Sequence, residues 1–504
     1  MKASRRSAIS PLAPAALALA FGLAACSDVE SGPSGGLRAA ACARKITPVV
    51  GVNHSDPIYM AGFANDRTPT GVHDDVWARG VVLESRGRKV AMVVLDVIGY
   101  FNNEIQTIRS LVRTPGFDAI VVSSTHNHEG PDTMGLWGES ETESGVDLGY
   151  LDFVNRQVAE CIDEAADALE PAEIRFATGD TRGTSLPPFP DLVADGEVLQ
   201  RLCVGGNFDA QGTCVGGIFV EGDPGTIDNP STPSFQVRRS GADRGTIATL
   251  VNYASHPEAL GSSNRLVTSD FPHYMRERLE ERFGGIAIYM SADLGVLQGP
   301  LDVFLADESG NEVPRRTFEF AERMGDILAR RAGDALEAVE RWDDDPPIEI
   351  AGTGPVSIVV ENPYFQFLGV LGVFGRRSFV QPDPSTFTVT SEVQALRIGP
   401  AQFAVTPNEL DPQIGNLYRA RMSGAQHRFV VGLGNDEIGY QMPQAKFNPS
   451  CFLCFRFNIS GEDPEGLCPQ ETNDCGTVFV NNIGPGADPQ LQGLMDGLLA
   501  GLND

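Results

Sequence analysis

Short runs of apolar and β-branched residues alternate with longer segments of helical periodicity along most of the chain. Residues 118–124 and 246–253 are two such runs, long enough for a strand and short for a core helix. Residues 149–168 instead repeat apolar residues at the spacing of an amphipathic helix. Apolar strands separated by helices indicate a sheet that is covered on both faces. The same reasoning predicts further strands at 79–84, 89–96, 172–178 and 285–290 and further helices at 101–113, 269–282 and 316–340.

The second half of the chain follows a different pattern. Strand-like runs recur without long helical segments between them, at 347–360, 391–398, 401–406 and 428–433. We therefore predict an α/β to mixed α+β fold, in which strands and helices alternate and one or more layered sheets are covered by helices.

The N-terminus has the pattern of an export signal. Basic residues precede an apolar run from Leu12 to Ala25, which is short for a bilayer span and typical of a secretory signal peptide. The run ends in Leu-Ala-Ala-Cys, which resembles the lipobox of bacterial lipoproteins and implies a lipid on Cys26. We predict a signal peptide at 1–25, a flexible tether at 26–40, and a lipid-anchored protein of the cell envelope. Ser27 favours the outer membrane, facing the periplasm or the outside.

Residues 41–504 are predicted to form a single large domain, because no clear linker or repeat interrupts them. A Gly/Pro-rich stretch at about 180–245 is expected to be an irregular insertion, and a Cys-rich segment lies at about 446–480. The formal net charge of −29 opposes contact with phosphate backbones and with anionic lipid. Nucleic acid is therefore excluded as a partner, and membrane attachment is assigned to the acyl chains.

Eight cysteines remain besides Cys26, an even number in a compartment where disulfides are the default. Cys203 and Cys214 bracket a Gly-rich stretch and are expected to form a local pair. The four cysteines of the C-terminal segment are expected to form two bridges, and their uneven spacing makes a structural zinc site the weaker alternative. Cys42 and Cys161 are left over, and their spacing gives no reason to join them.

Potential metal ligands and acid–base groups follow directly after four of the predicted strands. His126 and His128 follow 118–124, and residues two apart in an extended segment point the same way. His256 follows 246–253, Glu409 follows 401–406 and Tyr440 follows 428–433. Sheets of this class place ligands at the C-terminal ends of their strands, so we expect a catalytic zinc shell there. The alternative is a pair of hydrogen-bonded loop histidines, because spacing alone does not make the four strands neighbours.

Five segments resemble those of neutral, non-lysosomal ceramidases, in the same order, over about residues 44–445. Residues 124–131 are similar to that family's Thr-His-Thr-His-Ser-Gly-Pro, and 435–440 match its Asn-Asp-x-x-Gly-Tyr pattern. The other three are 60–63 with 71–80, 252–256, and Pro-Asn-Glu at 407–409, which is similar to the family's Pro-Gly-Glu.

The resemblance implies a hydrolase that cleaves the amide bond of ceramide, a lipid-like N-acyl substrate, with a single zinc. The family's zinc ligands fall on His126, His256, Glu409 and Tyr440. His128 would contact the substrate or polarise its carbonyl, so His126 and His128 are the expected catalytic residues. A zinc-activated water would attack the carbonyl, and a donor near the metal would hold the oxyanion.

Three residues are weaker candidates for lining the substrate site. His73 lies in a family-like segment, Trp137 follows the His-x-His loop, and Asp293 is all that 289–296 retains of the family's Gly-Asp-Val-Ser-Pro-Asn. Because the rest of that motif is missing, the sequence is consistent with more than one substrate. A zinc hydrolase of another ester or amide is one alternative, and a non-catalytic lipoprotein that binds lipids or partners is the other. The apolar run 364–375 is interpreted as a buried strand pair, or else as a loop that receives an acyl chain or dips into lipid.

Overall fold

The computed structural model describes residues 36–181, 231–295, 312–447 and 481–503, with short pieces at 185–186, 189–193, 207–208, 214–215, 299–301, 305 and 307. From Gly35 onward the chain forms one compact unit. The predicted signal peptide, Cys26, most of the tether, most of the insertion and nearly all of the Cys-rich segment lie outside the described residues.

The larger of two main sheets has eight strands in the order β14-β12-β11-β6-β1-β3-β4-β5. The pairs β12–β14 and β4–β5 are parallel and the other neighbours antiparallel. The strands are β1 (Arg38–Lys45), β3 (Trp77–Ser85), β4 (Arg88–Leu95), β5 (Ala119–Ser124), β6 (Glu170–Asp180), β11 (Ser231–Arg239), β12 (Thr246–Tyr253) and β14 (Ile286–Ser291).

A four-stranded sheet, in the order β15-β19-β20-β22, packs against one face of the large sheet. Its strands are β15 (Ile348–Gly352), β19 (Gln394–Ile398), β20 (Ala401–Val405) and β22 (His427–Val431). Side chains alternate across it, as a pleated strand requires. Leu396, Phe403 and Phe429 face the large sheet, where Phe403 lies 6.4 Å from Phe235 of β11 between ring centroids. Ala404 and Val430 face the opposite way.

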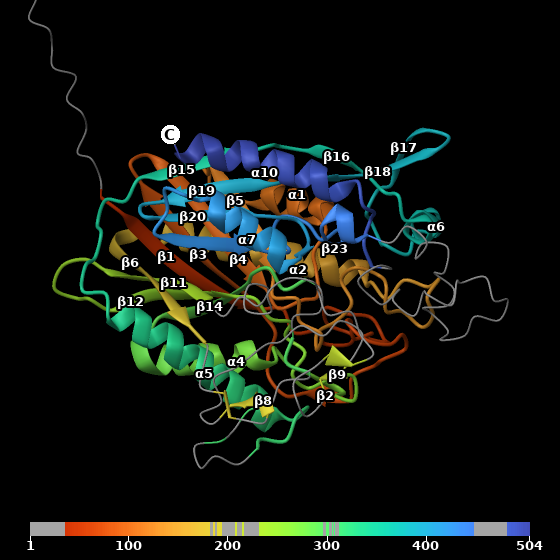
Figure 1. Cartoon of the computed structure of the whole chain (residues 1–504), viewed down its shortest axis with the longest axis horizontal. Helices are drawn as coiled ribbons and strands as arrows, with labels where there is room; N and C mark the ends of the chain where they lie inside the picture. The colour runs from red at the N-terminus through yellow and green to blue at the C-terminus, as the bar shows by residue number, and fades with distance from the viewer. Residues whose placement is uncertain are drawn as a thin grey trace, which may run out of the picture. The chain divides into compact units, whose positions relative to one another are not determined.

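Helices cover the outer faces of both sheets, so the unit has four layers (Figure 1). On the large sheet, α1 and α2 cover β1 and β3–β5, and α4 and α5 cover β12 and β14. The helix α10 packs on the small sheet together with α7 and α6. The seven α-helices of the described residues are α1 (Asn102–Leu111), α2 (Leu148–Asp167), α4 (Phe271–Phe283), α5 (Phe318–Glu337), α6 (Pro363–Leu371), α7 (Pro412–Arg421) and α10 (Ala487–Asn503).

Smaller elements complete the described fold. One three-stranded sheet has the order β16-β18-β17, and four two-stranded pairs are β2–β13, β21–β23, β7–β8 and β9–β10. Their bounds are β16 (Val356–Val359), β18 (Thr386–Ser391), β17 (Val380–Asp383), β2 (Gly71–Val72), β13 (Leu266–Val267), β21 (Glu409–Leu410), β23 (Tyr440–Gln441), β7 (Ser185–Leu186), β8 (Phe189–Val193), β9 (Asn207–Phe208) and β10 (Cys214–Val215), and a 3₁₀ turn η1 spans Gln444–Lys446.

The turn after β22 joins the two edges of the large sheet. On one side the Ser124 amide donates to the Leu433 carbonyl (3.2 Å), and on the other the Gly432 amide donates to the Ser291 carbonyl (3.1 Å). The Ser291 hydroxyl also donates to the Thr125 carbonyl (2.7 Å). A Cβ on Gly432 would lie 2.3 Å from the Ala292 carbonyl oxygen, so the close approach requires glycine there. The large sheet is therefore curled, which brings the ends of β5 and β12 to one place.

The mixed α/β architecture with layered, helix-covered sheets is confirmed. Four expectations need correction. The run 347–360 forms two strands separated near Gly354, whose φ is +64°. The insertion contains β11, a central strand of the large sheet, and β1 begins at Arg38, inside the expected tether. The run 364–375 begins as the helix α6.

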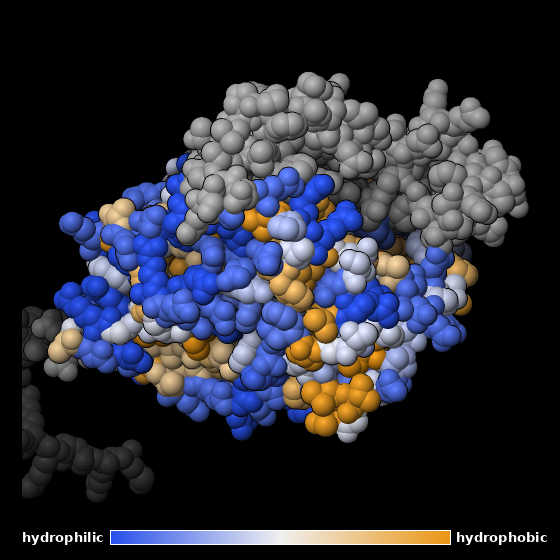
Figure 2. Space-filling view, turned by 90° about the horizontal axis from the view of Figure 1, so that it is seen from below, coloured by the Kyte–Doolittle hydropathy of each residue, from blue (hydrophilic) through white to orange (hydrophobic). Residues whose placement is uncertain are grey.

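The leftover cysteines are joined, because Cys42 of β1 and Cys161 of α2 form a disulfide. Among the described residues, no helix combines the length and the apolar character that a membrane span needs. Figure 2 shows a mostly hydrophilic face with separate hydrophobic patches, which fits the acidic composition of the chain.

Candidate metal centre

His126 enters the site through an unusual backbone turn. The chain leaves β5 at Ser124, and His126 has a φ of +64°, a region that residues other than glycine seldom adopt. His126 and His128 face the same site, with ring centroids 5.0 Å apart, but the expected extended backbone is not the reason. The Nδ1 atom of His126 lies 2.6 Å from the Ile98 carbonyl oxygen, which can only accept. Nδ1 therefore donates to this carbonyl, and Nε2 is the ring atom that faces the Glu409 carboxylate.

His256 and Glu409 meet His126 at one point. His256 follows the end of β12, and its Nε2 atom lies 3.0 Å from Oε2 of Glu409. Nε2 of His126 lies 3.3 Å from the same carboxylate oxygen. Glu409 opens the short strand β21, which pairs in parallel with β23 so that Glu409 stands directly opposite Tyr440. The Tyr440 phenol is hydrogen-bonded to the Glu409 carboxylate.

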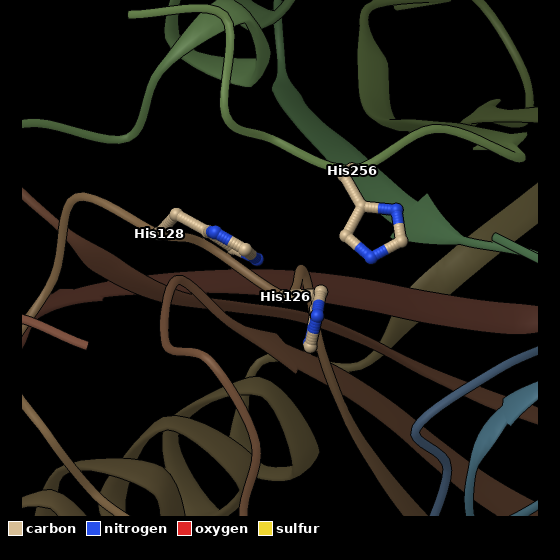
Figure 3. A group of neighbouring side chains, drawn as sticks. All are labelled: His126, His128 and His256. Atoms are coloured by element: carbon tan, nitrogen blue, oxygen red, sulfur yellow. The ribbon is translucent and has the colours of Figure 1, made fainter. Parts of the chain in front are cut away.

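Three imidazoles converge in this place. The side chains of His126, His128 and His256 are buried and point toward one another (Figure 3), and one ring nitrogen of each lies within 4.8 Å of the others. Neither ring nitrogen of His128 has a hydrogen-bond partner among the described residues, and its Nδ1 lies 3.6 Å from a Glu258 oxygen. Buried polar atoms are normally satisfied, so these unsatisfied nitrogens mark a place for a ligand.

Glu409 is ionised in this site, whereas burial keeps His128, Tyr440 and Glu437 neutral. Burial opposes ionisation of Glu409, but His126 and His256 lower its pKa to about 2, so the carboxylate is charged at neutral pH. Burial, with His126, His256 and Arg67, holds the pKa of His128 well below its usual range and keeps the ring neutral. Burial and Glu409 raise the pKa values of Tyr440 and Glu437. Three imidazoles around a charged carboxylate are a donor set suited to a divalent metal.

These polar groups close one part of an apolar cavity of about 230 Å³. His126, His128, Glu258, Glu409, Glu437 and Tyr440 line the polar part. The rest of the wall is mainly apolar and includes Phe63, Phe101, Trp137, Phe365, Phe374 and Phe379. A cavity with apolar walls and a few convergent polar groups is the usual form of a small-molecule site.

A second layer of contacts holds the loop that carries His128. The buried Arg67 guanidinium donates to the His128 carbonyl oxygen (2.9 Å) and is paired with Glu129. Gly62 packs against the His128 ring, and a Cβ there would lie 2.4 Å from the ring carbon Cγ. The His128 ring is thereby held in place by Arg67, which binds its backbone, and by Gly62, which packs against the ring.

The structure brings together His126, His128, His256, Glu409 and Tyr440, and Trp137 lies in the cavity wall. The expectations for His73 and Asp293 need correction, because neither lines this cavity. His73 is partly exposed and stacks on Phe318, with its Nδ1 2.9 Å from Asp74. Asp293 is buried in an ion pair with Arg419.

Sequence reasoning missed several groups that the cavity contains. Glu437 stands inside the motif 435–440, and Glu258 stands two residues after His256, so their positions were the available signal. The contact between the Ile98 carbonyl and His126 could not be predicted, because every residue has a backbone oxygen and the sequence does not show which one accepts.

Neutral ceramidases have this fold. A solved structure of neutral ceramidase from Pseudomonas aeruginosa superposes with a TM-score of 0.65 at 14% identity, covering 93% of this chain and 74% of that one. A structure described as ceramidase complexed with C2 superposes with a TM-score of 0.63, also at 14% identity, over 93% and 75% of the two chains. No family model matches the sequence, and no curated protein matches it. The likeness therefore shows a neutral-ceramidase-like fold.

Proposed function

We propose that this chain is a zinc-dependent amidohydrolase that cleaves an amide bond of a lipid-like N-acyl substrate. The observation that carries the proposal is the convergence of three buried imidazoles and the Glu409 carboxylate at the polar end of a largely apolar cavity. The ceramidase fold supports the same reaction class. The apolar wall supports a substrate with an aliphatic or aromatic chain.

The residues present fit a zinc ion. His126, His256 and Glu409 would hold it, with Tyr440 as a further oxygen ligand, because nitrogen and oxygen donors in small number suit zinc. The orientation of His126 by the Ile98 carbonyl is the kind of support that metal-binding histidines have. When bound in such a shell, zinc polarises a carbonyl and lowers the pKa of water to about 7.

Other residues would handle the substrate and the protons. His128 is neutral, lines the cavity and has free ring nitrogens, so it can donate a hydrogen bond to the substrate carbonyl oxygen. Amide hydrolysis forms a C–O bond from water and breaks the C–N bond, so the departing nitrogen must gain a proton. Glu437 can supply it. Its Oε1 accepts from the Gly439 amide (2.7 Å), its Oε2 has no partner among the described residues, and its pKa is raised by burial.

Attachment to the cell envelope through an acylated Cys26, in the outer membrane, belongs to the same proposal. Metabolic labelling with a radioactive fatty acid is the test. Label should enter the full chain and be absent from the Cys26→Ser variant, and an unlabelled parent chain would exclude acylation.

The experiment that tests the metal centre is elemental analysis of the purified chain beside His126→Ala and His256→Ala. We expect about one zinc per chain, lost in both variants. His273→Ala is the matched control, because that histidine is paired with Asp74 and lies outside the cavity, and it should keep the zinc. A parent chain that holds no metal after zinc is supplied would exclude the mechanism and leave a binding protein.

The substrate is tested next, with the metal-loaded chain. A long-chain N-acyl sphingoid amide, the ester of the same acid and a short-chain amide are compared at equal concentration. Preferential hydrolysis of the long-chain amide supports the proposal, and preferential hydrolysis of the ester would replace it with an esterase.

A further inference from the structure

The helix α6 (Pro363–Leu371) has apolar residues on two opposite sides. Tyr364, Phe365 and Leu368 form its inner stripe and are buried in the core. Phe367, Val370 and Leu371 form its outer face, at the same helical spacing, and are 49%, 70% and 49% exposed. A surface helix is normally polar on its outer side, and a helix that is apolar all round is normally buried. Among the described residues, the outer face of α6 therefore has no apolar partner.

The segment that contains α6 also lacks charged residues. Residues 362–375 contain no Asp, Glu, Lys or Arg, in a chain where 21% of the residues are charged. The long amide side chain of Gln366 donates to the Val360 carbonyl oxygen (2.7 Å), just before this segment. The first cations that follow are paired, Arg376 with Glu104 and Asp152, and Arg377 with Asp436. The surface thus offers nothing to a charged partner.

The inner side of α6 forms part of the cavity wall. Phe365 of the same helix lines the cavity, and so do Phe374 and Phe379, which follow it. Phe379 packs under Gly369, where an added Cβ would lie 2.7 Å from its ring. One turn of helix therefore separates the solvent from the wall of the cavity, and Figure 1 shows α6 and the neighbouring β17 at one end of the view.

The size of the outer face favours a lipid surface over a protein partner. Three half-exposed side chains bury far less than the about 800 Å² per partner of a standard protein interface. A few apolar side chains are enough for weak insertion between lipid headgroups.

We propose that the outer face of α6 docks on a zwitterionic lipid surface, so that a lipid substrate enters the cavity past α6 from the bilayer. The inference deepens the proposed function and rests on it for the identity of the substrate. Docking itself is independent of catalysis, so the two can fail separately.

The direct test places a tryptophan on the outer face. The full chain carries Cys26→Ser, so that no acyl chain contributes, and Phe367→Trp is compared with Leu417→Trp. Leu417 lies on α7, well away from α6 in the view of Figure 1, and is 45% exposed. Vesicles of brominated phosphatidylcholine quench a tryptophan that enters the bilayer. Phe367→Trp should lose at least half of its added fluorescence and Leu417→Trp almost none, and equal quenching of the two would overturn docking.

A second test uses charge. Val370→Asp and the control Leu417→Asp are made in the same background and floated with phosphatidylcholine vesicles. Because a carboxylate resists insertion, we expect Val370→Asp to lower the partition coefficient by roughly ten-fold or more and Leu417→Asp to leave it unchanged. Both sites are exposed, so unchanged thermal unfolding confirms that the variants are folded. Equal partitioning of Val370→Asp and its parent would overturn the proposal.

Activity assays separate docking from catalysis. If α6 docks on the bilayer, Val370→Asp should hydrolyse a vesicle-embedded N-acyl lipid several-fold more slowly than the parent does. It should hydrolyse a short soluble amide at the parent rate. If neither substrate is hydrolysed by the parent chain but flotation still depends on Val370, docking stands and the proposed reaction fails. Equal rates for the parent and Val370→Asp on the vesicle-embedded lipid would overturn the entry route.

Discussion

At the scale of single residues, Glu409 connects all parts of the candidate centre. Its carboxylate is within 3.3 Å of the imidazoles of His126 and His256 and is hydrogen-bonded to Tyr440. It is also the site's buried anion, since its pKa is held at about 2. This carboxylate therefore supplies a negative charge next to a dication held by the two imidazoles.

We expect Glu409→Gln to weaken zinc binding by at least ten-fold, because the amide keeps the shape and loses the charge. Competition with a chelator of known affinity measures the effect. Glu258→Gln is the matched control, since Glu258 lines the same cavity and its carboxylate lies beside His128, 3.6 Å from Nδ1, and it should bind zinc as the parent does. Equal affinities for parent and Glu409→Gln would remove Glu409 from the metal shell.

Asp147 caps the N-terminus of α2, where its carboxylate accepts from the amides of Tyr150 (2.8 Å) and Ser55 (2.7 Å). Burial alone would raise its pKa, but these hydrogen bonds lower it from 3.8 to about 2. A depressed carboxyl pKa stabilises the fold above the unfolded value and loses that effect as the pH falls through the folded one.

We therefore expect Asp147→Ala to lower the free energy of unfolding by about 1 kcal/mol at pH 7. Asp147→Asn keeps a capping oxygen and should lose less. The difference between the parent and Asp147→Asn should shrink as the pH falls from about 4 to about 2, which urea unfolding across that range measures. A difference that stays constant would show that the charge of Asp147 contributes nothing.

At the scale of elements, α6 offers a test within one helix. Leu368 is fully buried in the core cluster, whereas Val370 is 70% exposed. Truncation of a buried leucine removes transfer energy and leaves a cavity, so Leu368→Ala should cost about 2–5 kcal/mol. Val370→Ala should change the stability by less than about 0.5 kcal/mol. Guanidinium unfolding of the two variants compares them, and similar losses would mean that the outer face of α6 is packed against a partner in solution.

Elements with continuous apolar runs could be predicted from the sequence, and the others could not. The strand 246–253 and the helix at 149–168 are observed almost as predicted, because their periodicity is strong. The central strand β11 escaped notice because its buried positions include Ser234 and Gln236, and Gln236 is satisfied by Arg175 and Thr246 of neighbouring strands. Such partners are known only once the sheet order is known.

The same distinction holds for the site. His126, His256 and Glu409 could be predicted because each stands shortly after an apolar strand. Tyr440 opens β23, and its prediction depended on the motif 435–440. The aromatic wall from α6 could not, since nothing in the run 364–375 says which core it joins. Asp293 was misplaced because its partner Arg419 is 126 residues away in sequence.

At the scale of the whole molecule, the disulfide between Cys42 and Cys161 joins the layers. Cys42 lies on β1 in the large sheet, Cys161 lies on the covering helix α2, and 119 residues separate them. The closed loop contains β3, β4, β5 and the segment with His126 and His128. A bridge across so long a loop restricts the unfolded chain strongly.

We expect the double variant Cys42→Ala, Cys161→Ala to lose roughly 4–5 kcal/mol of unfolding free energy, the value for a loop of about a hundred residues. Both side chains are buried and alanine is smaller than half a cystine, so part of the loss would come from packing. The double variant Cys42→Ser, Cys161→Ser separates the loss of packing from the loss of the covalent link, since serine has nearly the volume of a cysteine side chain. Urea unfolding of parent and variants without reductant gives the values. If both variants retained the parent's stability, the fold would be held by its two-sheet core alone, and the loop that carries the histidines would need no covalent closure.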